Sequence, residues 1–281
     1  MPTFIGHLKQ WEYLQKLAQS KRMPQALIFS GPSEIGKFLV ARAWAEELIR
    51  NNSDCLVIEP ELVTKKGVTR AKDIGVGAVR DTVKQAALSS GGGKYRVLII
   101  RDAHRLTEKS QNALLKTLEE PPEHLIIILV THRVGRLLST VLSRCQKVDF
   151  HLVDEALMRS GMPSKKAVLE WIWQIGRPGL VRRCIDTPVK MKRDLELFER
   201  LSKLPSYSVQ QKLQLSESMA KDITKTICLL EWWLTLLHSR AAQGNDRAAW
   251  KLAERVFAVE QVLENQSKSS RLVLDTLFLG V

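Results

Sequence analysis

Four short apolar runs within the first 150 residues constrain the fold of this chain more than any other feature. They span residues 26–30, 55–59, 97–100 and 125–130. Unbroken apolar runs of this length are typical of strands in a parallel sheet, because helices cover both faces of such a sheet. Segments 37–50 and 109–120 carry apolar residues at helical spacing, and two prolines follow the second segment. The pattern predicts an α/β domain built on a parallel sheet.

Strand signals fade after about residue 151, and the remainder of the chain is predicted to be helical. Two short helices are expected on either side of the Gly-Arg-Pro-Gly turn at 176–179. After residue 188 we expect about three or four longer amphipathic helices, with apolar stripes such as Ile223, Ile227 and Leu230. The predicted architecture is therefore an α/β domain followed by all-helical material.

The composition excludes several classes of protein. With 281 residues, of which 44% are hydrophobic, the chain can bury a core, and this excludes disorder. The longest apolar run, 125–130, is far shorter than the roughly 20 residues that cross a bilayer, and the amino-terminal residues do not resemble a signal peptide. We therefore expect a cytoplasmic protein with no membrane partner. The formal charge of +13 is spread along the chain, so by itself it supports only a weak expectation of DNA contact.

Metal-ligand residues show no recognisable spacing. The four cysteines lie dozens of residues apart, so reduced thiols and no zinc site are expected. The six histidines form no H-x-x-x-H pair, and His104 and His132 lie at expected strand ends, where ordinary hydrogen bonding is commoner than catalysis. The sequence therefore predicts no metal site.

A phosphate-binding loop is predicted between the first strand and the helix that follows it. The pattern G-x-x-x-x-G-K is matched by Gly31, Pro32, Ser33, Glu34, Ile35, Gly36 and Lys37, with Phe38 next. In such a loop the glycines let backbone N–H groups turn toward phosphate oxygens, and the lysine reaches the terminal phosphates of a nucleotide. The segment therefore predicts an ATP site.

The part of this site that would hold Mg²⁺ is degraded. The pattern requires Ser or Thr after Lys37 to place a hydroxyl on the metal, and this chain has Phe38. Arg101 stands where a metal-organising Asp should follow the strand at 97–100, and a guanidinium repels a divalent cation. We therefore expect little or no ATP hydrolysis by the chain alone. Binding of ATP or ADP without efficient hydrolysis remains open.

A longer set of motifs resembles the bacterial clamp-loader branch of the AAA+ proteins. The motifs are Phe-Ile-Gly-His at 4–7, the run at 24–32, NALLKTLEEPP at 112–122, LVTH at 129–132, SRCQ at 143–146 and, more weakly, residues 269–279. Within that branch the chain is most similar to the delta-prime subunits of the DNA polymerase III holoenzyme. Their nucleotide site is also frequently degraded.

This resemblance implies a domain organisation and a set of partners. The implied domains are a P-loop AAA+ domain at 1–150, a small helical lid at 151–188 and a helical collar for oligomerisation at 189–281. The implied partners are clamp-loader motor subunits and a delta subunit in a five-subunit ring, together with the sliding clamp and primer-template DNA. Many such subunits carry a four-cysteine zinc module before the second strand, and residues 51–55 leave no room for it. No structural zinc is therefore expected.

The resemblance also assigns roles to two further residues. Arg144, in the motif Ser143-Arg144-Cys145, is implied to be an arginine finger that reaches into the ATP site of a neighbouring motor subunit. An arginine supplied in trans neutralises charge on the transferred phosphoryl group. The alternative is an ordinary surface arginine in a turn. Thr131 falls where the family keeps a polar residue near the γ-phosphate, and the alternative there is a strand-end hydroxyl that satisfies the backbone.

The function implied is that of a delta-prime-like stator of the clamp loader in DNA replication, which donates Arg144 to a neighbour and is not an ATPase on its own. The alternative is a motor-type clamp-loader ATPase that tolerates Phe38 and Arg101 by moving its metal ligands. An AAA+ protein acting outside replication would require the motifs at 114–122 and 143–145 to mislead.

Overall fold

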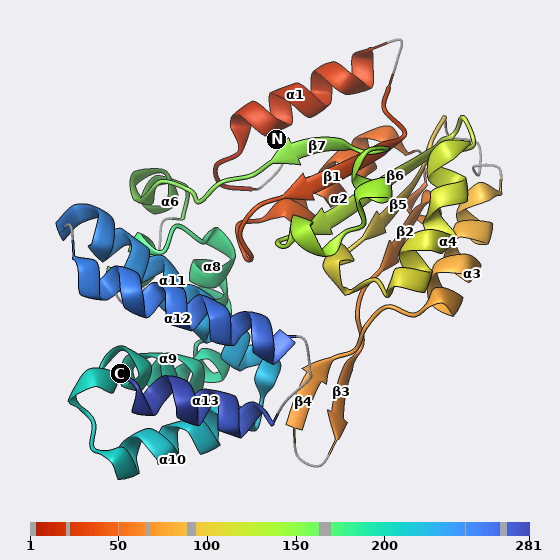
Figure 1. Cartoon of the computed structure of the whole chain (residues 1–281). Helices are drawn as coiled ribbons and strands as arrows, with labels where there is room; N and C mark the ends of the chain where they lie inside the picture. Colours follow the sequence, from red (N-terminus) through yellow and green to blue (C-terminus); the bar gives the residue numbers. More distant parts are fainter. Residues whose placement is uncertain are drawn as a thin grey trace. The chain divides into compact units, whose positions relative to one another are not determined.

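The chain, represented by a computed structural model, is described over residues 4–20, 23–49, 51–65, 68–88, 94–162, 170–244, 246–264 and 269–281. It forms two compact units (Figure 1). The first, here called the sheet unit, comprises Met1–Glu61 and Lys72–Arg182, and the second, the helical unit, comprises Leu62–Ala71 and Arg183–Val281. The expected domain boundaries at residues 150 and 188 remain predictions.

A five-stranded sheet with only parallel pairings forms the centre of the sheet unit, with strand order β2-β5-β6-β1-β7. The strands are β1 (Ala26–Ser30), β2 (Cys55–Ile58), β5 (Arg96–Ile100), β6 (Leu125–Thr131) and β7 (Gln146–Asp149). The four predicted strands are all present, each within one residue of its predicted bounds. The predicted α/β fold class is therefore confirmed.

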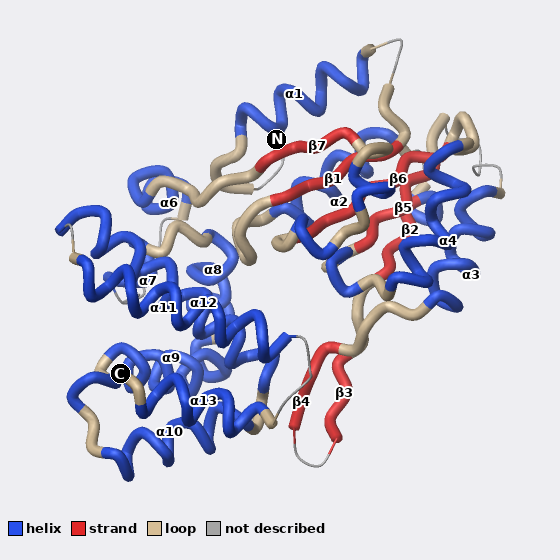
Figure 2. The backbone as a smooth tube through the Cα atoms, viewed as in Figure 1, coloured by secondary structure: helices blue, strands red, loops and turns tan. Residues whose placement is uncertain are grey.

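Helices cover both faces of this sheet (Figure 2). They are α1 (Leu8–Gln19), α2 (Lys37–Leu48), α3 (Val76–Ala87) and α4 (Glu108–Glu119). Along β1, Leu27 and Phe29 belong to one apolar cluster with residues of α1 and α2, whereas Ala26 and Ile28 belong to a second cluster with residues of α3 and α4. Burial on both faces explains the unbroken apolar runs of β1, β5 and β6, whereas in β2, an edge strand, only Ile58 is buried. Arg50, the last residue of the helix expected at 37–50, which corresponds to α2, lies outside the described residues.

Three of the described strands were not predicted. In β7, an edge strand, only Val148 is buried, so its sequence contains no apolar run. The strands β3 (Leu62–Lys65) and β4 (Val68–Ala71) form an antiparallel hairpin that belongs to the helical unit. The backbone N–H of Ala71 donates a hydrogen bond to Thr224 Oγ1 at 3.0 Å. A strand with a single buried residue, such as β7, is missed by a search for apolar runs.

Shorter elements complete the sheet unit. They are η1 (Asn52–Asp54), η2 (Ala103–Arg105), η3 (Val134–Arg136), α5 (Ser139–Leu142), α6 (Glu155–Gly161), α7 (Glu170–Gln174) and α8 (Pro178–Asp186), the last of which continues into the helical unit. As predicted, two short helices, α7 and α8, meet at a turn here, but α8 begins at Pro178, inside the turn expected at 176–179. Gly176 in that turn has a φ of +71°, a left-handed conformation that favours glycine.

The described part of the helical unit contains five longer helices, more than the three or four expected. They are α9 (Pro188–Ser202), α10 (Val209–Ala220), α11 (Ile223–Gly244), α12 (Arg247–Glu264) and α13 (Ser270–Leu279), with the short η4 (Leu204–Ser206) after α9. Only Lys221 and Asp222 separate α10 from α11, so the apolar pattern hardly marks that break. Within the described ranges, no helix has the length and apolar character needed to cross a membrane.

Candidate functional site

The predicted phosphate-binding loop connects β1 to α2 at the carboxyl edge of the sheet. Its glycines Gly31 and Gly36 have φ angles of +140° and +102°, and Glu34 between them has a φ of +58°. Gly31 also has no room for a side chain, because a Cβ there would lie 2.1 Å from the carbonyl oxygen of Phe150. The loop leads directly into α2, whose first backbone N–H groups have no carbonyl partner within the helix and form a ready anion site.

Lys37 is buried and is folded back onto the loop. Its ammonium donates hydrogen bonds to the carbonyl oxygens of Gly31, at 2.7 Å, and of Pro32. The structure therefore brings together the lysine and the start of the predicted motif. A phosphate bound at this loop would compete with the two carbonyls for the ammonium, and its charge makes it the stronger acceptor.

Two side chains from distant parts of the chain support the loop. The ring Nε2 of His7 donates to the carbonyl oxygen of Ile35 at 2.8 Å, and burial lowers the pKa of His7. The buried Arg177, in the turn before α8, donates from Nη1 to the Ser33 carbonyl at 3.4 Å and to the Ser33 hydroxyl. These partners are 28 and 144 residues apart in the sequence. No local pattern could therefore have assigned them this role.

Phe38 and Arg101 pack against each other at the start of α2. The guanidinium of Arg101 lies over the Phe38 ring, 5.1 Å from its centroid, and pairs with Glu59 at 3.2 Å. A positive charge is thus stacked on the residue that replaces the metal-binding hydroxyl. A divalent cation there would be repelled and would lack an oxygen ligand from position 38. The loss of ATP hydrolysis remains a prediction, for which this geometry supplies the physical reason.

Thr131, at the end of β6, is paired in register with Ser30 at the end of β1 and is therefore next to the loop. Its hydroxyl is buried, accepts a hydrogen bond from the Arg133 N–H at 3.0 Å, and lies 3.4 Å from His104 Nδ1. These contacts suit a strand-end hydroxyl that satisfies the backbone, and the position beside the loop suits a phosphate contact. Both interpretations of Thr131 remain open.

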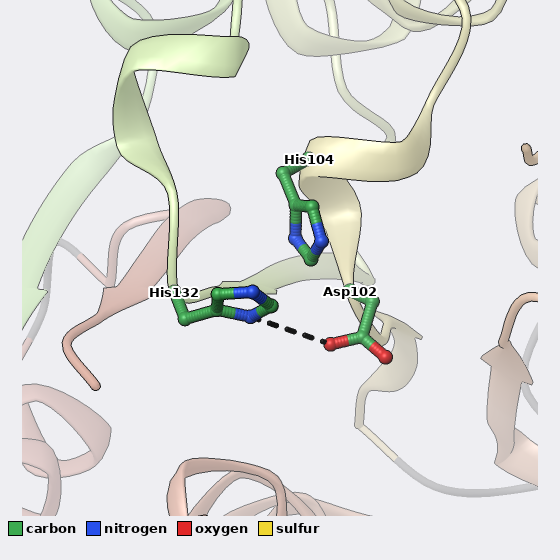
Figure 3. Close-up of side chains that lie close together, drawn as sticks. All are labelled: Asp102, His104 and His132. Carbon is green, nitrogen blue, oxygen red and sulfur yellow. Dashed lines mark ion pairs between the residues drawn. The ribbon is translucent and has the colours of Figure 1, made fainter. Parts of the chain in front are cut away.

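A cluster of metal-ligand side chains lies at the carboxyl ends of β5 and β6 (Figure 3). Asp102 and His104 follow β5, His132 follows β6, and one potential ligand atom from each lies within 4.8 Å of the other two. His132 Nδ1 is 3.8 Å from Asp102 Oδ1, and the centroids of the two imidazole rings are 4.1 Å apart. From the sequence, no metal site was predicted here. The missed signal was that β5 and β6 are neighbouring parallel strands, whose ends meet at one edge.

The electrostatic surroundings of this cluster keep His132 neutral. Burial, followed by the charges of Lys37 and Arg133, holds the pKa of His132 well below its usual value. At pH 7 its 3.8 Å contact with Asp102 is therefore between a neutral ring and a carboxylate, and it becomes an ion pair only on protonation.

Arg144 lies on the surface just after α5. Its Nη2 donates to Glu119 Oε1 at 2.7 Å and its Nη1 donates to the Thr140 carbonyl at 2.9 Å. These partners belong to α4 and α5, not to the phosphate-binding loop of the same chain. The side chain is 34% exposed. Both interpretations of Arg144, a finger for a neighbour and an ordinary surface arginine, are compatible with this position.

Cys145 should react slowly with alkylating reagents in the folded protein. It packs partly buried against the core beneath α3 and α4, and burial raises the pKa of its thiol to about 11. At pH 8 roughly one thiol in 1,000 is then ionised, against about one in ten for a cysteine with the ordinary pKa of 9.0, so we expect alkylation about 100-fold slower. Peptide mass spectrometry after a timed iodoacetamide pulse measures this. The same pulse in urea is the control, and equal labelling in the two states would contradict the prediction.

Residues of the sheet unit are similar to known proteins, both to a family model and to individual relatives. Residues 6–154 match the family model for "DNA polymerase III, delta subunit". The tau subunit of DNA polymerase III from Bacillus subtilis is 37% identical over 159 residues, which are 52% of this chain and 28% of that protein. The tau subunit from Escherichia coli is 34% identical over 167 residues, which are 53% of this chain and 25% of that protein. The chain thus spans about a quarter of the length of these relatives.

Two solved structures from Thermotoga maritima are similar over larger parts of the chain. A DNA polymerase III gamma subunit-related protein is 18% identical, with a TM-score of 0.49 and coverage of 96% of this chain and 97% of that one. The RuvB Holliday junction branch migration motor is 21% identical, with a TM-score of 0.47 and coverage of 68% and 64%. At these scores neither likeness bears on function.

Proposed function

We propose, because the chain belongs to the DNA polymerase III delta subunit family, that it is a delta-prime-like stator subunit of a sliding-clamp loader in DNA replication. In this role it joins motor subunits and a delta subunit in a five-subunit ring that acts on the sliding clamp and on primer-template DNA. It lends Arg144 to the ATP site of a neighbour and hydrolyses little or no ATP itself.

The observation that carries this proposal is the contact between Arg101 and Phe38. Phosphoryl transfer to water depends on Mg²⁺ that bridges the phosphates, held in P-loop enzymes by a Ser or Thr hydroxyl and an acidic residue. In this chain an aromatic ring replaces the hydroxyl, and the Arg101 guanidinium lies 5.1 Å from the centre of that ring. Loss of the hydroxyl ligand and addition of a positive charge both weaken Mg²⁺ binding, and both therefore lower the rate of ATP hydrolysis. A subunit with such a site contributes to catalysis through a neighbour.

The surroundings of Arg144 support a role in trans. Its ion pair with Glu119 is at the surface, with side-chain exposures of 34% and 50%. Exposed pairs of this kind contribute about 0–1 kcal/mol, because water screens them and ordering two long side chains costs entropy. The guanidinium can therefore leave Glu119 at little cost and bind the phosphates of a nucleotide on another subunit, where several charge-assisted hydrogen bonds replace one ion pair.

A motor-type ATPase is the second candidate, and one observation favours it: the phosphate-binding part of the loop retains Gly31, Gly36 and Lys37. In this alternative the chain would bind and hydrolyse ATP with metal ligands drawn from elsewhere. Retention of the phosphate-binding residues also leaves open that the stator holds ATP or ADP without turning it over.

The two candidates differ in the ATPase activity of the purified chain. For the stator we expect phosphate release with Mg²⁺-ATP to be the same for the unaltered protein and for Lys37→Ala, because neither organises the metal. The Lys37→Ala variant serves as the control, since an ATPase that co-purifies is unaffected by it. Turnover that is clearly above background and lost in Lys37→Ala would replace the stator proposal with the motor one. Equilibrium binding of a fluorescent ATP analogue to both proteins separately reports whether nucleotide is held.

A further inference from the structure

We propose that Asp102, His104 and His132 form a binding site for one divalent transition-metal ion of the Zn²⁺ class. This proposal does not depend on the proposed role in clamp loading. From the sequence alone, no metal was expected in this chain.

The arrangement of the three side chains carries the proposal. A ligand atom from each residue lies within 4.8 Å of those of the others. Ligands bound to a single tetrahedral Zn²⁺ ion lie about 2.0–2.2 Å from the metal, so a pair of them is separated by about 3.3–3.6 Å. His132 Nδ1 and Asp102 Oδ1, at 3.8 Å, are close to that separation. The remaining approach is a shift of at most about 1.5 Å, which side-chain rotation supplies.

The backbone that carries these ligands is firmly placed. His104 belongs to η2 and is 6% exposed. His132 directly follows β6, every residue of which is buried. Asp102 has a φ of +51°, an uncommon conformation for a residue other than glycine, which directs its carboxylate toward His132 (Figure 3). Ligands from rigid strand ends bind a metal with little loss of conformational entropy.

A contact behind the ligands resembles the outer shell of known metal sites. Histidines that bind metals usually engage a second group through the other ring nitrogen, which fixes the tautomer and the orientation of the ring. The Thr131 hydroxyl lies 3.4 Å from His104 Nδ1 and is itself held by the Arg133 N–H at 3.0 Å. Thr131 can therefore orient His104.

The identity of the ligands selects the class of metal. Two imidazoles and one carboxylate suit Zn²⁺ and its neighbours in the first transition series, whereas Mg²⁺ and Ca²⁺ prefer an all-oxygen shell. Three protein ligands also leave a fourth position for water or for another molecule, as in open zinc sites.

The charges around the site set its strength. Lys37 and Arg133 face His132, and Arg105 and Arg177 add to their positive potential. The ammonium of Lys37 donates hydrogen bonds to the carbonyl oxygens of Gly31 and Pro32, and the partial negative charges of these oxygens offset part of its positive potential. One carboxylate among several cations gives a net unfavourable field for a cation. We therefore expect a dissociation constant in the micromolar range instead of the much tighter binding of structural zinc sites.

The test uses the full-length, untagged protein after treatment with a chelator, with Co²⁺ and Zn²⁺ as probes. We expect one Co²⁺ per chain, with visible d–d absorption and no thiolate charge-transfer band, and displacement of that ion by Zn²⁺ but not by Mg²⁺. His104→Ala and His132→Ala each remove a proposed ligand and should weaken binding by at least about 100-fold, since loss of an outer-shell partner alone costs about 10–100-fold. The matched control is His151→Ala, which removes an exposed histidine outside the cluster.

Circular dichroism of each metal-free variant establishes that it is folded. If an alanine variant fails to fold, Asp102→Asn and His132→Gln, which keep the volume and polarity of the side chain, decide the question instead. No binding at micromolar metal overturns the proposal. Binding with unchanged affinity in the variants at 102, 104 and 132, or a thiolate charge-transfer band, also overturns it, because the ion would then occupy another site.

Discussion

The Arg144→Ala variant, assembled with its partner subunits, is expected to lose about 10³-fold of the ATP turnover at the one neighbouring site that it serves. As negative charge spreads over the transferred phosphoryl oxygens, an arginine supplied by another chain stabilises the transition state more than the bound nucleotide. Its removal therefore lowers the rate of the chemical step. Nucleotide binding at that site should change far less.

Assembly and folding should be unaffected in this variant. Arg144 is exposed, and its contacts with Glu119 and Thr140 are surface contacts that contribute at most about 1 kcal/mol. Single-turnover ATP hydrolysis in the DNA-bound complex isolates the affected site from the other active sites. Size-exclusion chromatography of the complex checks assembly.

The matched control is Arg80→Ala, which removes the same charge from an exposed position on α3. It should leave single-turnover kinetics unchanged. Equal rates for the unaltered complex and for Arg144→Ala would mean that Arg144 is an ordinary surface arginine and not an arginine finger.

The Gly31→Ala variant is expected to lose about 3–5 kcal/mol of the free energy of unfolding, because backbone strain and a steric clash combine. The φ of +140° at Gly31 is one that side chains disfavour, and the added Cβ would lie 2.1 Å from the Phe150 carbonyl oxygen and 2.9 Å from its carbon. That carbonyl cannot yield easily. Phe150 is buried, and its N–H donates to the Ser30 carbonyl at 2.7 Å.

Variants at two other glycines separate the cost of backbone strain from the cost of the steric clash. Gly36 has a φ of +102°, and an added Cβ there would have no atom within 4 Å, so Gly36→Ala tests strain alone and should cost about 1–2 kcal/mol. Gly77, exposed inside α3, has neither problem, and Gly77→Ala should stabilise by about 0.5–1 kcal/mol through helix propensity. Urea unfolding followed by circular dichroism measures all three. A loss below about 1 kcal/mol for Gly31→Ala would mean that the β7 end moves aside.

Most of the strands that could be predicted are those whose burial gives an apolar run in the local sequence; β2 has such a run although only Ile58 in it is buried. β1, β5 and β6 are covered on both faces, so each is a run of apolar residues. β7 has the pattern Gln-Lys-Val-Asp with one buried residue, and Leu62 in the hairpin is exposed. Such segments become strands because a neighbouring backbone offers hydrogen bonds, and this cause lies elsewhere in the chain.

The candidate site likewise has one part that is visible in the local sequence and other parts that depend on the fold. The loop from Gly31 to Lys37 is contiguous, so its spacing is visible in the sequence. Contacts such as Arg177 with Ser33 depend on the path of the chain over more than a hundred residues. The cluster of Asp102, His104 and His132 was within reach of prediction, since it follows once β5 and β6 are recognised as adjacent. The order of the strands was the missing information.

The chain passes between the sheet unit and the helical unit three times, after Glu61, after Ala71 and after Arg182. Domains joined by one linker can be exchanged or released at that linker. Here a cut after Arg182 leaves the β3–β4 hairpin on the fragment that carries the sheet unit, so residues 183–281 are then held to the hairpin only by non-covalent contacts. A truncation at the same place removes Thr224, the hydrogen-bond acceptor for Ala71. Neither unit is therefore a contiguous stretch of sequence that recombination could transfer intact to another protein.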